Sequence, residues 1–129
     1  MIYVLDTHAM AWYVDNDPRL SKAADAAIQD PIADLVIPTI ALVEIRYLHA
    51  KGRIQSSPAM IEQKIISARK CRVHPLDEEV VSLIPIGLDI HDSIIVATAL
   101  VYRDILHQPT TLITKDGKIT RSGLIQTLW

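Results

Sequence analysis

Ile2-Tyr3-Val4-Leu5-Asp6 places four apolar residues in a row near the start of the chain and ends them with an acid. An unbroken apolar run of this length is typical of a strand that is buried on both faces, as in a parallel sheet. Leu35-Val36-Ile37 and Thr111-Leu112-Ile113-Thr114 have the same form. Cys71-Arg72-Val73 is a weaker candidate, and residues 124–129 fit an edge strand.

Helical patterns occupy the spaces between these strands. They cover residues 8–14, 21–28, 40–51, 57–70, 77 to about 85, and 91–106. Thr7 is expected to cap the first of these helices, and Gly52 to end the third. Short apolar strands that alternate with helices predict an α/β fold, with a parallel sheet covered by helices on both faces.

The composition predicts one domain spanning residues 1–129, because the length is near the common domain size and half of the residues are apolar. A formal charge of −2 argues against a polycation that coats nucleic acid. It does not exclude a nuclease, since bound divalent cations add positive charge. With one cysteine, no signal-peptide pattern and no apolar run near membrane-spanning length, we expect a cytoplasmic protein without a membrane segment.

Two acids stand where predicted strands end. Asp6 follows residues 2–5, and Asp116 follows residues 111–114. Ligand sites of open parallel sheets lie outside the carboxyl ends of the strands, so both acids fall at the expected place. Because Asp is also common in turns and caps, each one taken singly has an ordinary structural explanation.

Two further acids lie on predicted helices. Glu44 shares a helical face with apolar residues such as Ala41 and Ile45, so its carboxylate sits on or beside the buried stripe. An ionised carboxylate there needs a compensating partner, either a salt bridge or a metal ion. Asp92 heads the longest helical pattern, where it also fits a simple cap. Taken together, four converging carboxylates offer the oxygen ligands that Mg²⁺ or Mn²⁺ prefers.

At these residues the chain resembles the PIN-domain (PilT N-terminus) nucleases, and specifically the VapC toxins. The resemblance rests on four short motifs that follow one another in the family's order and span almost the whole chain. They are Val4-Leu5-Asp6-Thr7-His8-Ala9, Ala41-Leu42-Val43-Glu44-Ile45-Arg46-Tyr47-Leu48, Asp89-Ile90-His91-Asp92-Ser93 with the apolar residues after it, and Leu112-Ile113-Thr114-Lys115-Asp116. One departure is Ser93, where the family often has Arg.

The resemblance implies a PIN-like, three-layer α/β/α sandwich around a central parallel β-sheet. It also implies a Mg²⁺- or Mn²⁺-dependent endoribonuclease that acts on RNA, forms a homodimer and is inhibited by a small cognate antitoxin of the VapB kind. Asp6, Glu44, Asp92 and Asp116 take the family's acidic positions. Thr7 and Thr114 would be their hydroxyl neighbours, able to orient a carboxylate or a metal-bound water.

Our hypothesis for the mechanism assigns Asp6 and Asp92 to the principal metal and Asp116 to the same ion or a second one. Glu44 would complete the cluster and orient or deprotonate the attacking water. Phosphate contacts would come from basic residues near these motifs, although solvated surface charge is the commoner role for any one of them. These residues are Lys51, Arg53, Lys115, Lys118 and Arg121.

Three alternatives remain open from the sequence. A receiver-like phosphorylatable domain requires a central strand that residues 45–70 do not supply. An HD-type phosphohydrolase, which His91-Asp92 brings to mind, requires several histidine ligands, and the histidines here lack ligand spacing. A catalytically silent PIN-fold binding module would be expected to lack some of the four acids, all of which are present.

Overall fold

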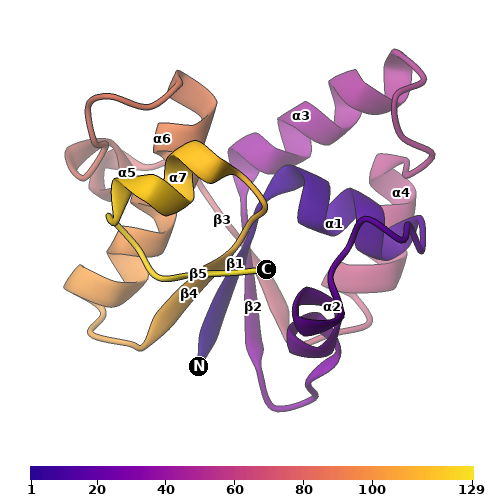
Figure 1. Cartoon of the computed structure of the whole chain (residues 1–129), viewed down its shortest axis with the longest axis horizontal. Helices are drawn as coiled ribbons and strands as arrows, with labels where there is room; N and C mark the ends of the chain where they lie inside the picture. The colour runs from indigo at the N-terminus through magenta and orange to yellow at the C-terminus, as the bar shows by residue number, and fades with distance from the viewer.

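The computed structural model describes residues 1–129, which fold around one five-stranded sheet. The strand order is β3-β2-β1-β4-β5, and every neighbouring pair is parallel. The strands are β1 (Ile2–Leu5), β2 (Asp34–Pro38), β3 (Cys71–His74), β4 (Thr110–Ile113) and β5 (Thr127–Leu128). All five predicted strands are therefore present, and β1 lies at the centre of the sheet (Figure 1).

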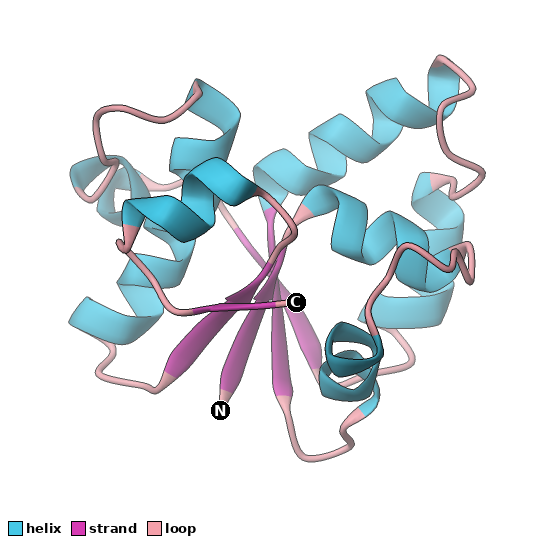
Figure 2. Ribbon diagram, viewed as in Figure 1, coloured by secondary structure: helices cyan, strands magenta, loops and turns pink.

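Helices cover both faces of the sheet (Figure 2). Their bounds are α1 (Thr7–Val14), α2 (Lys22–Gln29), α3 (Thr39–Ala50), α4 (Pro58–Ile61), α5 (Glu78–Ser82), α6 (Ile90–Leu100) and α7 (Gly117–Ser122), with π-helical turns η1 (Glu62–Ile66) and η2 (Val101–Ile105). Helices α1 to α4 lie on one side of the sheet, and α5 to α7 lie on the other (Figure 1). The predicted three-layer α/β/α sandwich is confirmed.

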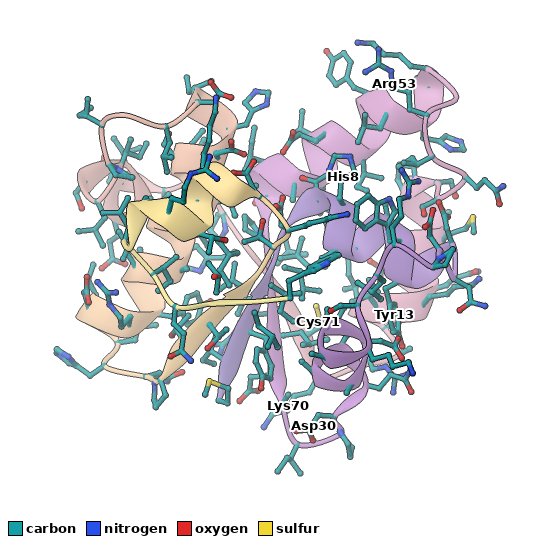
Figure 3. The ribbon with its side chains drawn as sticks, viewed as in Figure 1. His8, Tyr13, Asp30, Arg53, Lys70 and Cys71 are labelled. Carbon is teal, nitrogen blue, oxygen red and sulfur yellow. The ribbon has the colours of Figure 1, made fainter.

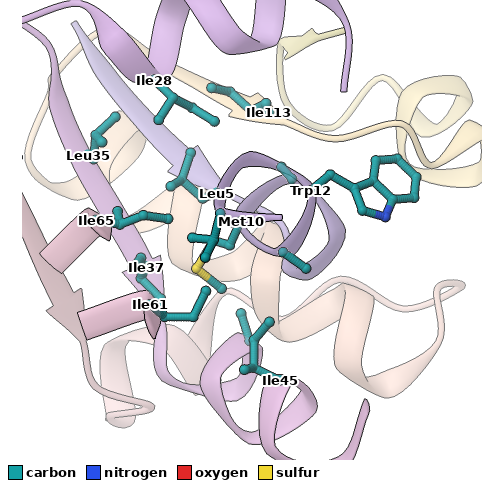
Figure 4. Packing of buried hydrophobic residues seen from close by; sticks show 14 of the residues in the cluster. Leu5, Met10, Trp12, Ile28, Leu35, Ile37, Ile45, Ile61, Ile65 and Ile113 are labelled. Carbon is teal, nitrogen blue, oxygen red and sulfur yellow. The ribbon is translucent and has the colours of Figure 1, made fainter. Parts of the chain in front are cut away.

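The side chains on the two faces of β1 pack into two separate apolar clusters. Leu5 packs with α1, α2, α3 and the α4–η1 segment in a cluster of 17 buried residues, part of which Figure 4 shows. Ile2 and Val4 face the opposite layer and pack with residues of α6 and α7. Because side chains alternate along a strand, one short run of apolar residues can serve both layers. None of the helices combines the length and hydropathy that a membrane span requires.

Two predicted helices differ from the structure in the same way. The helix expected over 57–70 is α-helical only to Ile61 and continues as η1, and the one expected over 91–106 becomes η2 after Leu100. A π turn inserts one residue, which rotates the rest of the helix by about 100° around its axis. Leu106, the last residue of the helix expected over 91–106, is 47% exposed after this turn. Apolar spacing alone does not separate an α turn from a π turn.

Candidate active site

The four predicted acids meet in one pocket at the carboxyl end of the sheet. Asp6 follows β1, Glu44 lies on α3, Asp92 lies in the first turn of α6, and Asp116 follows β4. The pocket is lined by Asp6, Thr7, His8, Trp12, Glu44, Asp92, Lys115 and Asp116. Elements far apart in the sequence therefore bring the four acids together, as the sequence predicted.

Asp6 is the most constrained of the four acids. Its Oδ1 accepts a hydrogen bond from the Thr7 backbone N–H at 2.6 Å, and its Oδ2 accepts one from the Thr114 hydroxyl at 2.5 Å. Burial raises the pKa of Asp6, while these hydrogen bonds oppose the increase. Asp6 rather than Thr7 is the N-cap of α1, so the predicted cap was wrong by one residue. The carboxylate reaches the free N–H of the first turn, which the Thr7 hydroxyl does not.

The Thr114 hydroxyl connects two of the acids. It donates to Asp6 and accepts from the Asp116 backbone N–H at 3.1 Å. Asp116 in turn caps α7, because its Oδ1 accepts from the Ile119 N–H at 2.9 Å. One side chain at the end of β4 thus sets the positions of the carboxylates that follow β1 and β4.

Under the ribonuclease hypothesis drawn from the sequence, replacing Thr114 with valine is expected to lower RNA cleavage roughly 10- to 100-fold, the usual effect of losing a group that orients a metal-binding carboxylate. Valine keeps the shape of the buried side chain but leaves Asp6 Oδ2 and the Asp116 N–H without their partner. Thr114→Ser keeps the hydroxyl and is the matched control. Steady-state cleavage rates of both variants would test this, and equal rates would remove the proposed link.

Glu44 is also held by residues from other elements. The Thr7 hydroxyl donates to Glu44 Oε1 at 2.8 Å, and His91 Nδ1 lies 3.6 Å from Oε2. Thr7 therefore contacts a carboxylate, as its predicted auxiliary role requires. A carboxylate beside the apolar stripe was expected to need a partner. Thr7 and His91 are the side chains that contact it, and neither is near Glu44 in the sequence.

The pKa of Asp92 responds to the charges of the other acids in the pocket. Burial and then the charges of Asp116, Asp6, Asp89 and Glu44 raise its pKa to about 6, from an ordinary value of 3.8. The N-cap of α6 is Asp89, and Asp92 accepts no hydrogen bond at the helix terminus, so it is not the simple cap considered from the sequence. Its neighbour Ser93 is buried and donates to the Ile90 carbonyl at 2.7 Å, so it gives nothing to the pocket.

The donor set fits a hydrated divalent cation better than a fully caged one. No group of three His, Cys, Asp or Glu side chains is already arranged to hold an ion directly. Mg²⁺ keeps several waters and is usually bound through one or two carboxylates, so it does not need such a cage. The pocket volume of about 410 Å³ leaves room for the ion, its waters and a phosphate.

Sequence reasoning did not single out His8 and Trp12, although both line the pocket. Their rings lie 5.3 Å apart on one face of α1. The signal was available, because residues four apart on a helix share a face and His8 follows Asp6-Thr7 directly. Lys115 was named only as one of five basic residues, yet it is the basic residue of that group that reaches the pocket.

Comparison with known structures finds the same fold in two complexes. VapBC2 from Rickettsia felis, solved bound to a DNA fragment from its promoter, is 16% identical with a TM-score of 0.68, over 99% of this chain and 98% of that one. VapBC-1 from nontypeable Haemophilus influenzae is 23% identical with a TM-score of 0.63, over 99% and 97%. A search of curated protein sequences found no match.

Comparison with models of protein families gives the assignment. The PIN domain matches residues 3–123, a range that contains all four acids and nearly every element of the sandwich. The structure independently has the central parallel sheet and the covering helices that this fold requires. The chain belongs to the PIN domain family.

Proposed function

We propose that this protein is a Mg²⁺- or Mn²⁺-dependent endoribonuclease that hydrolyses RNA phosphodiesters. The observation that carries the proposal is the convergence of Asp6, Glu44, Asp92 and Asp116 on one pocket of a PIN domain. The pKa of Asp92 is raised first by burial and then by the charges of the other acids, and a bound divalent cation would offset both effects. Carboxylate oxygens are the ligands that these hard cations prefer.

Each acid has a distinct role in this proposal. Asp6 and Asp92 would hold the principal cation, and Asp116 would hold the same ion or a second one. A divalent cation in such a site supplies Lewis acidity to the phosphate and makes the attacking water more acidic. Glu44, which accepts a hydrogen bond from Thr7 and lies beside His91, would orient that water and take its proton as the water oxygen bonds to phosphorus. The bond from phosphorus to the leaving ribose oxygen breaks in the same step, and that oxygen takes a proton from solvent water.

The biological part of the proposal is that the chain is a VapC-type toxin with a cognate VapB-like antitoxin. The motif resemblance supports it, as does the fold shared with two solved VapBC complexes. A homodimer that acts on cytoplasmic RNA belongs to the same proposal. Co-expression with the protein encoded by the adjacent reading frame, followed by co-purification, tests the partner.

The activity is tested by incubating the purified protein with single-stranded RNA and Mg²⁺ or Mn²⁺. We expect cleavage with either metal and its complete loss in EDTA, restored when metal is added back. A DNA strand of the same sequence controls for substrate class. RNA that stays intact under all metal conditions would contradict the proposal and leave a silent binding module as the better description.

A further inference from the structure

The five basic residues that the sequence suggested as phosphate contacts lie at different places in the structure. Lys115 lines the acid pocket, whereas Lys51 lines a different hollow beside Tyr47 on α3. Arg53 lies beyond the far end of α3, away from His8 at the start of α1 (Figure 3). Lys118 and Arg121 are exposed on α7 and do not line the pocket. Lys115 is thus the basic side chain beside the acids.

Lys115 does not pair with these acids. It forms no salt bridge, although four carboxylates line the same pocket. Its ammonium instead lies over the indole of Trp12, 5.7 Å from the ring centroid. Arg19 also lies over this ring, at 4.6 Å, but it is hydrogen-bonded to both carboxylate oxygens of Asp17. Of the two cations on Trp12, Lys115 is the one whose charge has no carboxylate partner.

Trp12 gives the lysine a fixed support. Trp12 is 8% exposed and belongs to the larger apolar cluster. It also packs edge-on against Trp129, with the ring centroids 5.7 Å apart. Figure 4 shows the ring directed away from the aliphatic side chains of the cluster. A cation over an aromatic face is attracted by the ring's negative face, so Trp12 limits where the ammonium lies.

The backbone of Lys115 is held as well. Thr114 before it bonds to Asp6, and Asp116 after it caps α7. The backbone of Lys115 is therefore restrained, and the attraction of its exposed ammonium to the Trp12 ring favours one position for the end of the side chain. A restrained cation loses less conformational entropy when it binds an anion than a freely moving surface lysine does.

We propose that Lys115, positioned by Trp12, binds a phosphate of the RNA strand beside the acid pocket. The inference rests on the proposed nuclease function and adds a substrate contact to it. The carboxylates repel the phosphates of the RNA backbone. A cation at the edge of their pocket attracts a phosphate and so holds the strand beside the acids. A lysine ammonium suits this role because it donates up to three hydrogen bonds from one compact charge.

The test compares Lys115→Met with Lys118→Met, which removes an equally exposed charge three residues later on α7. Methionine keeps a flexible apolar stem over Trp12 while removing the charge. Binding of a fluorescein-labelled, mixed-sequence 20-nucleotide RNA is measured by anisotropy in the Asp92→Asn background, where the expected loss of activity leaves most of the RNA uncleaved during the measurement. Cleavage of the same RNA is measured in the wild-type background.

We expect Lys115→Met to raise Kd and KM about five- to tenfold and to change kcat less than twofold. The slope of log Kd against log salt should become shallower by about 0.7, the single-strand value for one phosphate contact. Lys115→Arg should restore most of the binding, and Lys118→Met should change none of these quantities.

Equal Kd, KM and salt slope in Lys115→Met and the parent protein would overturn the inference. Losses of the same size in Lys118→Met would also overturn it, because they would show a diffuse charge effect. These outcomes are distinct from failure of the nuclease proposal, which shows as absence of cleavage by the wild-type protein. The binding measurement tests Lys115 even in that case.

Discussion

Asp92→Asn is expected to lower kcat for RNA cleavage by about 10²- to 10⁴-fold, the range typical for loss of a group central to the chemistry. The carboxylate lies at the meeting point of the charges from Asp6, Asp116 and Glu44, and it accepts no hydrogen bond that would give it a purely structural role. Asparagine has nearly the same shape, so the fold should be kept. Steady-state cleavage at saturating metal measures the effect.

Asp89→Asn is the matched control, because Asp89 is the exposed N-cap of α6 and adds to the charge around Asp92 but does not line the pocket. Its activity should stay within about threefold of the wild-type value, as expected for surface charge changes. Full activity of Asp92→Asn, or equal losses in both variants, would show that Asp92 does not belong to the catalytic cluster.

Asp92→Asn is expected to lower activity but to raise the thermal stability of the protein when no metal is bound. The pKa of Asp92 is about 6 in the folded protein and ordinarily 3.8, so the folded state binds more protons between these values. The free energy of unfolding therefore falls as pH rises through this window. In EDTA, Asp92→Asn should have the higher Tm at pH 7.5 and a much smaller advantage at pH 4. An equal Tm difference at both pH values would contradict this.

Ile45→Ala is expected to lower the free energy of unfolding by about 2–5 kcal/mol, the usual cost of removing this much buried hydrocarbon. Ile45 is fully buried in the larger apolar cluster and anchors α3, the helix that carries Glu44, to the neighbouring helices and sheet. Urea denaturation followed by circular dichroism measures the change. A loss under 1 kcal/mol would mean that α3 is not anchored as described.

Val43→Ala is the control for this prediction. Val43 lies on the same helix, on the other side of Glu44, and is 40% exposed. Its substitution should cost about 1 kcal/mol or less, because the side chain keeps a large part of its contact with water in the folded state. Two apolar residues that flank one catalytic acid should thus differ several-fold in their contribution to stability.

Much of the architecture was predictable from short-range pattern. The apolar runs at residues 2–5, 35–37 and 111–114 identified three central strands. A strand that is buried on both faces is apolar at nearly every position, so it can be recognised from a short stretch of sequence. The acids that end two of these runs marked the carboxyl edge of the sheet. Glu44 was identified as a candidate because a charge beside an apolar stripe needs a partner. Asp92 taken alone fitted a cap, and it became a candidate only as one of the four acids.

The π turns η1 and η2 were not predicted, because the apolar pattern that predicted the helices does not distinguish a π turn from an α turn. A helix that gains one residue keeps its apolar composition and changes only which side faces the core. The hydrogen bond from the Leu106 N–H to the Val101 carbonyl, at 3.0 Å, belongs to that changed geometry. The sequence carries no separate signal for it.

The sequence by itself determined which residues form strands and which acids stand at their ends. Only the tertiary structure decided that the Thr114 hydroxyl joins Asp6 across 108 positions of chain and that Lys115 lies over Trp12 rather than on a carboxylate. Strand and helix patterns arise from neighbours along the chain, whereas these contacts exist only after β4 pairs with β1 and α1 packs beside them. Their geometry depends on the whole packed arrangement, which no local window of residues contains.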